Sequence, residues 1–89
     1  MNLITEGKAY FFKTFSHYYL GRVRHATPTH VVLDEASEVY DTGPLATFFG
    51  EGKPKRCERL PDGWSVPLGA TAFGPWDHKL PTKKVGGPA

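Results

Sequence analysis

Glycine and proline interrupt this chain every few residues, and their spacing limits its fold more than any other feature of the sequence. Ten glycines and eight prolines fall within 89 residues, and both residue types disfavour the interior of a helix. Only residues 44–50 leave room for a short helical turn, so short strands joined by turns are expected elsewhere. A chain of this length has room for one core. The sequence therefore predicts a single all-β domain.

The stretch HYYLGRVRHATPTHVVLDEASEVYD, residues 17–41, has the clearest strand pattern. Residues 9–15 and 18–24 are expected to pair as a hairpin, because two runs rich in aromatic and apolar residues flank a short polar connection. In the second strand, Gly21 and Val23 share the face that we expect to be packed. A glycine inside a strand marks a bend, a bulge or the close approach of another backbone, and a small barrel needs such a bend in order to close.

Pro28 lies in the turn after this strand, where its ring fixes φ. The β-branched run at residues 30–34 then predicts a third strand, with Val31 and Leu33 as core contacts. Residues 37–41 either continue this strand or form a fourth one after a break near Ala36. We assign structural roles to Gly21, Val23, Pro28, Val31 and Leu33.

The second half of the chain is predicted to add the helical turn and further strands. Phe48 and Phe49 on the helical turn would plug one open end of a barrel. Strands are expected at residues 55–60, 64–68 and 70–76, with a Pro-Asp-Gly turn between the first two. Residues 77–89 show no periodicity and predict an extended tail. Five or six short strands with a bent second strand favour a small SH3-like or Sm-like barrel over residues 1–76.

The sequence also indicates the environment of the protein. Cys57 is the one cysteine, so no intramolecular disulfide can form and a reducing compartment is expected. No apolar run approaches the roughly 20 residues of a membrane span, and the first residues lack the basic and then apolar order of a signal peptide. We therefore expect a soluble, intracellular protein that does not bind a membrane.

Three histidines raise the question of a metal site. His17, His25 and His30 could bind zinc together with Asp34 or Cys57, since imidazole, carboxylate and thiolate are all zinc ligands. None of these residues comes as a close pair of the C-x-x-C or H-x-x-x-H kind. Histidines at strand ends are more commonly solvated. No metal or other cofactor is predicted.

Cys57 is the candidate nucleophile. Arg56 and Arg59 could lower the pKa of its thiol and so activate it, but a lone cysteine is usually a small buried hydrophobe. The chain has no Gly-x-Ser-x-Gly turn and no His-Glu-x-x-His motif, and it is small for a shielded active-site pocket. A non-enzymatic protein without catalytic residues is predicted.

Charge is unevenly distributed along the chain. The formal net charge is +2 and the sequence pI is about 8.8, just below the value above 9 that is typical of dedicated nucleic-acid modules. An acidic segment holds Asp34, Glu35, Glu38 and Asp41, and a basic segment holds Lys53, Lys55, Arg56 and Arg59. Such a polarised surface suits a protein partner, self-association or a phosphate backbone.

Two kinds of partner surface are compatible with these residues. Nucleic acid would be bound by the cations Arg22, Arg24, Lys53, Lys55 and Arg56, with Tyr10 or Tyr18 as a stacking platform. A protein interface would use aromatic residues, of which about half would instead fill the barrel. These aromatic residues are Phe11, Phe12, Tyr18, Tyr40, Trp64 and Trp76. The predicted partner-binding residues are Tyr18, Arg22, Arg24, Lys53, Lys55, Arg56 and Trp76.

The runs HYYLGRVRHATPTHVVLDEASEVYDTGPL and PDGWSVPLGATAFGPWDHKLP resemble a family of small SH3-like β-proteins encoded by bacteriophages and by bacterial genomes that carry prophages. Proteins of that family have a similar strand followed by glycine, a VVLxxA strand, an acidic segment ending in Asp-Thr-Gly, a short helix and a tryptophan-containing end. The resemblance covers roughly residues 8–81. It implies a role in a phage and brings no catalytic residues.

Gly21, Val23 and the strand at residues 30–34 also resemble the first motif of the Sm and Sm-like RNA-binding rings. This resemblance implies the same fold. The Asp and Asn that help to shape the RNA pocket of that family fall near Thr27 and Val31 here, and its second motif has no clear counterpart. RNA binding therefore does not follow from the resemblance.

These observations together predict a non-enzymatic module that acts by protein contact. The leading hypothesis is a structural component of a phage virion, such as a capsid cement protein or an accessory head or tail protein, present in the host-cell cytoplasm and in the virion. Its partner would be a phage structural protein or a second copy of the chain, with pairing between the acidic and basic segments. A nucleic-acid-binding module and an inhibitor of a host protein are the alternatives.

Overall fold

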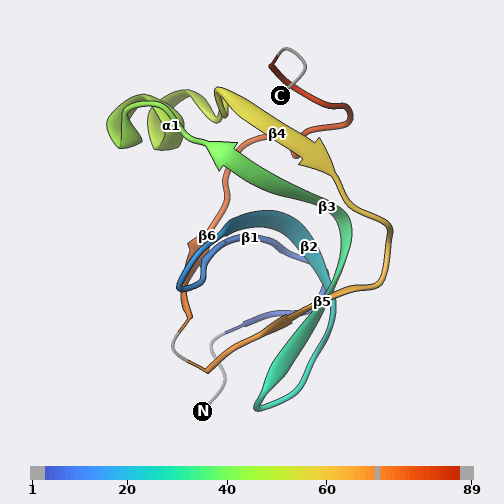
Figure 1. Ribbon diagram of the computed structural model, residues 1–89. Helices are drawn as coiled ribbons and strands as arrows, with labels where there is room; N and C mark the ends of the chain where they lie inside the picture. The colour runs from blue at the N-terminus through green and yellow to red at the C-terminus, as the bar shows by residue number, and fades with distance from the viewer. Residues whose placement is uncertain (1–3, 70, 87–89) are drawn as a thin grey trace.

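The computed structural model describes residues 4–69 and 71–86 (Figure 1). Residues 1–3 of the expected domain, Ala70 of the expected last strand and residues 87–89 of the expected tail lie outside the described residues. The elements are β1 (Ala9–Lys13), β2 (Tyr18–Ala26), β3 (His30–Asp41), α1 (Leu45–Glu51), β4 (Arg56–Arg59), β5 (Trp64–Pro67) and β6 (Ala72–Pro75). The predicted mostly-β class with one short helix is confirmed.

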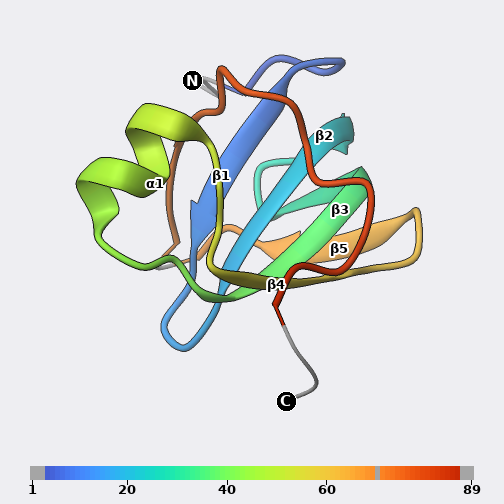
Figure 2. The same ribbon diagram turned by 90° about the horizontal axis from the view of Figure 1, so that it is seen from above.

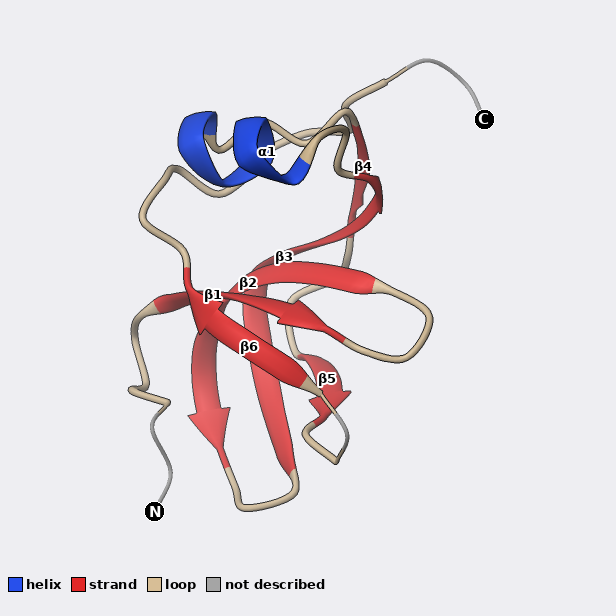
Figure 3. Ribbon diagram, turned by 90° about the vertical axis from the view of Figure 1, so that its left-hand side faces the viewer, coloured by secondary structure: helices blue, strands red, loops and turns tan. Residues whose placement is uncertain are grey.

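The strands form one antiparallel sheet in the order β4-β3-β2-β1-β6, with β5 also paired to β3. Because β3 is 12 residues long, residues 30–33 pair with β5 and residues 37–41 pair with β4. The sheet curls strongly along these pairings (Figure 3). Within the described residues no pairing joins β5 to β6, so the sheet does not close on itself.

A β-bulge bends the sheet where β2 crosses β3. Leu20 pairs with Ser37 and Arg22 pairs with Asp34, so Glu35 and Ala36 together lie opposite Gly21. Glu35 has a φ of 51°, which is unusual for a residue other than glycine, and it occupies the bulge position where a left-handed residue is required. The expected irregularity at Gly21 is confirmed. Of the two alternatives for residues 37–41, the structure has the continuation of the third strand, since β3 runs unbroken past Ala36.

Gly21 is required at this bend by the approach of a neighbouring side chain. A Cβ atom at Gly21 would lie 3.0 Å from Cδ1 and 3.1 Å from Cβ of Leu33, closer than ordinary van der Waals contact. The absence of a side chain therefore lets β3 lie close against β2. The turn between these two strands is closed by the Thr27 N–H, which donates to the His30 carbonyl oxygen at 2.8 Å, with Pro28 inside the turn as predicted.

Two hydrophobic cores lie on opposite faces of the sheet. The first fills the inside of the curl and contains Ile4, Tyr10, Phe12, Val23, Val31, Leu33, Ala36 and Val66. The second contains Phe11, Leu20, Val39, Phe48, Cys57, Trp76 and Leu80. β1 contributes to both cores, because Phe11 and Phe12 are neighbours in a strand and so point to opposite faces. The predicted core residues Val23, Val31 and Leu33 all belong to the first core.

The second core buries Leu20 and Phe48. Leu20 lies on the face of β2 opposite to Gly21 and Val23, and it is also fully buried, since α1 and β4 cover that face. Phe48 packs against Phe11 and Trp76 in this core, with ring centroids 5.4 and 5.0 Å apart respectively. Phe48 was expected to plug one open end of a barrel together with Phe49; it lies in the second core, and Phe49 is 46% exposed.

The first hairpin is shorter than predicted. β1 ends at Lys13, and the Thr14 N–H donates to the His17 carbonyl oxygen at 2.8 Å to close the turn. Phe15 lies at the tip of this turn and its side chain is fully exposed. The predicted strand at residues 9–15 therefore loses its last two residues to the turn.

The chain after Trp76 returns to the second core. Leu80 is 9% exposed within that core, and Val85 and Cys57 exchange both of their backbone hydrogen bonds, each 3.0 Å long. Figure 1 shows α1 and β4 at the end of the molecule to which this segment returns, and Figure 2 views that end from above. We call residues 77–86 the C-terminal segment. Its apolar residues hold it against the fold.

Candidate functional site

The two arginines predicted to bind a partner are held by carboxylates of the neighbouring strand. Arg24 donates from Nε and NH2 to the two carboxylate oxygens of Asp34, at 2.9 and 2.5 Å. The hydrogen bond from Arg24 holds the pKa of the Asp34 carboxyl below its ordinary value. Arg22 donates from Nε to Oε2 of Glu35 at 2.6 Å and from NH1 to the Gly7 carbonyl oxygen at 3.2 Å. Both guanidinium charges are therefore compensated within the molecule.

The rest of the acidic segment is also engaged. Oε2 of Glu38 lies 3.2 Å from Nε2 of His17, and Oδ1 of Asp41 accepts a hydrogen bond from the Gly43 N–H at 2.8 Å. The expected pairing of this segment with the basic segment of a second copy would have to compete with these contacts within the chain. The β2–β3 register accounts for the two arginine pairs, because it brings cations and carboxylates of adjacent strands together.

The three histidines do not converge. Nδ1 of His25 lies 3.1 Å from Oε2 of Glu6, and Nδ1 of His30 lies 3.0 Å from the Thr29 hydroxyl, while His17 faces Glu38. Across residues 4–69 and 71–86, no group of three histidine, cysteine or carboxylate side chains is arranged to hold a metal ion. The zinc arrangement considered from the sequence is thus not assembled among these residues.

Cys57 is a core residue and not an activated thiol. Its side chain is 1% exposed in the second core, and burial raises the pKa of the thiol. The hypothesis that Arg56 and Arg59 lower this pKa is wrong in its net direction, because the opposing charge effect of Arg59 is smaller than that of burial. Arg59 donates from NH1 to the Ala36 carbonyl oxygen at 2.8 Å.

The aromatic residues predicted for an interface divide between core and surface. Phe11, Phe12 and Trp76 are buried, whereas Tyr40 and Trp64 are 53% and 38% exposed. The assignment of Trp76 to a partner surface is therefore corrected, since α1 and Leu80 enclose its ring in the second core.

The two tyrosines considered for stacking are also drawn into the fold. Tyr18 is half-buried and stacks on Phe11, with ring centroids 5.6 Å apart. Tyr10 is buried in the first core, and its hydroxyl accepts a hydrogen bond from the Thr5 N–H at 2.7 Å. The Tyr10 ring is therefore enclosed, and one face of the Tyr18 ring is taken up by Phe11.

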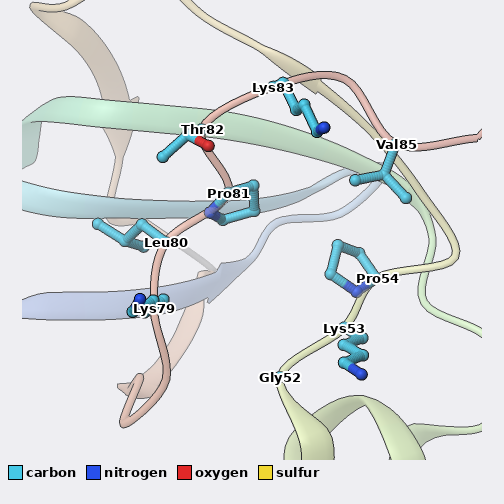
Figure 4. A pocket seen from close by; sticks show the side chains of 9 residues that line it. All are labelled: Gly52, Lys53, Pro54, Lys79, Leu80, Pro81, Thr82, Lys83 and Val85. Carbon is cyan, nitrogen blue, oxygen red and sulfur yellow. The ribbon is translucent and has the colours of Figure 1, made fainter.

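Among the described residues, a groove lies between the end of α1 and the C-terminal segment (Figure 4). We call it the lysine groove. It is open to solvent, has a volume of about 600 Å³ and is lined by Gly52, Lys53, Pro54, Lys79, Leu80, Pro81, Thr82, Lys83 and Val85. Pro54 and Leu80 are buried in its floor, Pro81 and Val85 are half-buried, and all three lysines are exposed. The groove therefore combines an apolar floor with a cationic rim.

The end of α1 positions one wall of the lysine groove. Gly52 caps the helix in the left-handed conformation, with a φ of 70°, and its N–H donates to the Phe48 carbonyl oxygen at 2.9 Å. This geometry turns the chain sharply into Lys53 and Pro54. The His78 ring lies where a Cβ atom of Gly52 would be, and its Nε2 is 2.6 Å from the Phe49 carbonyl oxygen. Glycine is thus required at this position for two independent reasons.

Cations without an ion pair gather at this end of the molecule, where the unpaired carboxylates Glu51 and Asp77 also lie. All of the chain's acidic and basic side chains lie in the described ranges. In these ranges, Lys53, Lys79 and Lys83 on the groove make no ion pair, and neither do Lys55 and Arg56, which follow Pro54 directly in the sequence. Lys84 differs, because its Nζ lies 3.4 Å from Oε1 of Glu58.

The structure thus separates the predicted partner-binding residues. Lys53 lines the lysine groove, Lys55 and Arg56 adjoin it in sequence, and the other four are paired or packed elsewhere. Sequence reasoning missed Lys79, Lys83 and the apolar floor, because residues 77–89 were expected to form an extended tail. Leu80 and Val85 were the available signal, since apolar residues are unusual in a solvated tail.

Within the described ranges, α1 is the one helix, and it is neither long nor apolar enough to cross a membrane. Comparison with known proteins found no matching family model, no matching curated protein and no matching solved structure.

Proposed function

We propose that this chain is a non-enzymatic protein-interaction module and that the lysine groove is its binding surface. The carrying observation is the coincidence of an apolar floor with three lysines that have no partner among the described carboxylates. Apolar area supplies binding free energy, and matched charge supplies orientation and a faster approach. The groove offers both at one place.

The residues that line the groove favour binding over catalysis. The lining consists of lysines, one threonine, glycine and apolar residues. A hydrolytic or transfer reaction needs a nucleophile and a general base within hydrogen-bond reach of one another. The buried thiol of Cys57 belongs to the second core and does not line the groove.

The more specific proposal is that the partner is a phage structural protein, which makes the chain a capsid cement protein or an accessory head or tail protein. It derives from the resemblance of residues 8–81 to small phage-encoded β-proteins. The same resemblance suggests that the curled sheet is an SH3-like barrel left open between β5 and β6. The strand order and the short helix before β4 are compatible with this description.

Size-exclusion chromatography of the labelled protein with purified phage shells tests this function. Co-migration with the shells supports a virion role, and migration as a free monomer in the presence of every shell and tail preparation would overturn it. Titration of single-stranded RNA and DNA at low and moderate salt tests the nucleic-acid alternative, whose expected signature is a steep loss of affinity with salt. Capture from a host lysate, followed by loss of activity of the captured enzyme, would instead support an inhibitor.

A further inference from the structure

We infer that the lysine groove takes an extended acidic peptide segment with aliphatic side chains, supplied by another protein. This inference rests on the protein-interaction function proposed above and specifies the chemistry of the partner. Three features of the groove carry it: the apolar floor, the backbone groups along one wall and the charge balance of the whole chain.

The floor selects aliphatic side chains. Pro54 and Leu80 are buried there, and Pro81 and Val85 are half-buried. Figure 4 shows the two prolines and Val85 grouped between the two chain segments that form the walls. No aromatic side chain lines this space. Leucine or valine side chains fit such a surface, because they remove apolar area from water without a need for stacking partners.

The C-terminal segment offers backbone hydrogen bonds to an extended partner. Within residues 71–86, the N–H groups of Leu80, Thr82, Lys83 and Lys84 donate no backbone hydrogen bond to another described residue. A peptide in the β conformation can pair with such a segment and place alternate side chains toward the floor and toward the rim. Backbone pairing would thereby fix the peptide in the direction of the groove.

The three lysines favour an acidic partner, and the charge balance of the chain favours a different protein over a second copy. Of the nine Asp and Glu side chains, only Glu51 and Asp77 make no hydrogen bond or ion pair within the described ranges, and both are exposed. The remaining carboxylates accept hydrogen bonds or face cations of this same chain. A second copy therefore has few carboxylates to offer Lys53, Lys79 and Lys83, and an acidic segment of a different protein meets this requirement.

A nucleic acid would match the positive charge of the lysine groove but would not fill its apolar floor. Single strands are held by aromatic side chains on which bases stack, together with cations along the backbone. The groove has cations without an aromatic platform, and the arginines Arg22 and Arg24 are held by carboxylates on β3. Peptide side chains use the apolar floor, whereas a phosphate backbone would leave it unfilled.

Fluorescence anisotropy tests this inference on the full chain. The probe is a fluorescein-labelled peptide with a central pair of leucines flanked by aspartates. Its comparators are the same peptide with serines in place of the leucines and a short oligothymidylate. We expect saturable binding of the leucine peptide that weakens several-fold as salt shortens the screening length from about 10 to about 3 Å, and binding of both comparators that is at least about tenfold weaker.

Matched variants locate the site. The double variant Lys79→Glu and Lys83→Glu should weaken peptide binding about tenfold or more, because two attractions become repulsions. The double variant Lys8→Glu and Lys13→Glu makes the same change of net charge at exposed lysines that do not line the groove, and it should weaken binding less than about twofold. Thr82→Trp should also reduce binding by filling the groove without a change of charge. Circular dichroism confirms that each variant is folded.

Several results would overturn the inference. These are equal losses in the two double variants, equal binding of the serine peptide, tighter binding of the oligothymidylate, or no binding of any probe. Co-migration with phage shells that persists in the Lys79→Glu and Lys83→Glu variant would leave the protein-interaction function standing and reject the groove as its acidic-peptide site. Loss of co-migration in this variant, but not in the control, supports both.

Discussion

Replacing Leu80 with alanine tests whether the C-terminal segment is part of the folded domain. The sequence pattern alone predicts a solvated tail at this position, and a substitution in such a tail changes stability by less than about 0.5 kcal/mol. In the structure Leu80 is 9% exposed and packs with Trp76 and Phe48 in the second core. The two descriptions therefore predict different free energies of unfolding.

The magnitude follows from the atoms removed. Leucine to alanine deletes three carbon atoms, worth about 0.8 kcal/mol each when they are buried, so the transfer contribution is about 2 kcal/mol. The cavity contribution should be small, because Leu80 also lines the open lysine groove, where water can reach the vacated space. We expect a loss of about 2–3 kcal/mol, at the low end of the range for buried leucines. For a domain of this size that loss lowers Tm by about 10–20 °C.

Urea unfolding followed by tryptophan fluorescence measures this loss, because Trp76 packs in the same core. Thr82→Ala is the matched control, since Thr82 is exposed on the same segment, and it should change the free energy of unfolding by less than about 0.5 kcal/mol. A Leu80→Ala variant as stable as the wild type would refute the packing of this segment. A control that destabilises equally would show that the effect does not come from burial.

Three further changes test other parts of the structure. Gly52→Ala should lower the free energy of unfolding by about 2 kcal/mol, because the alanine would combine a positive φ with a clash against His78. Gly69→Ala is the control: a Cβ atom at Gly69 has no other atom within 4 Å, so this variant should have nearly the wild-type stability in the same urea titration. Asp34→Asn should lower the urea midpoint at pH 7. The difference from the wild type should shrink as pH falls through the lowered pKa of Asp34, because a depressed carboxyl pKa stabilises the fold only while the group is ionised. A difference that stays constant down to acid unfolding contradicts a stabilising ion pair between Asp34 and Arg24. Cys57 should react with a thiol reagent at least about a hundredfold faster in urea than in the native protein. The reason is that burial both shields the thiol and raises its pKa. Rapid reaction of the native protein would show that the second core is open to solvent.

The local features of the fold could be predicted because each depends on a few neighbouring residues. Pro28 sets its turn, Gly21 marks the bend, and the run predicted as a helical turn at residues 44–50 contains most of α1. Proline and glycine mark turns, bends and close approaches in a sequence even when the partner strand is unknown. The bulge at Glu35 was harder to predict from the sequence, because the positive φ of Glu35 depends on the pairing with the opposing strand.

The second core could not be predicted from the same pattern. Alternation in β2 places Leu20 with arginines on one face, and that pattern is typical of a solvent-exposed surface. The covering residues come from α1, β4 and the C-terminal segment, up to 60 residues further along the chain, as Leu80 shows. Burial that depends on such distant segments leaves no local signal.

The residues of the candidate site could be predicted only in part, for the same reason. Lys53 was predicted from the basic segment alone. Lys79 and Lys83 line the groove because Leu80 packs the C-terminal segment against the second core. The availability of Arg22 and Arg24 to a partner was overestimated, because their ion pairs with carboxylates depend on the register between β2 and β3. Charge patterns along a sequence show how many cations exist but not which of them are already neutralised.

The alternation of Phe11 and Phe12 in β1 has a thermodynamic consequence. Because one strand anchors both cores, neither core can come apart without loss of the strand that the other requires, so the domain should melt as one cooperative unit. A ligand that occupies the lysine groove binds only the folded form and therefore stabilises every part of it. Amide hydrogens of Val31 and Leu33, on the far side of the sheet, should then exchange more slowly when the groove is filled.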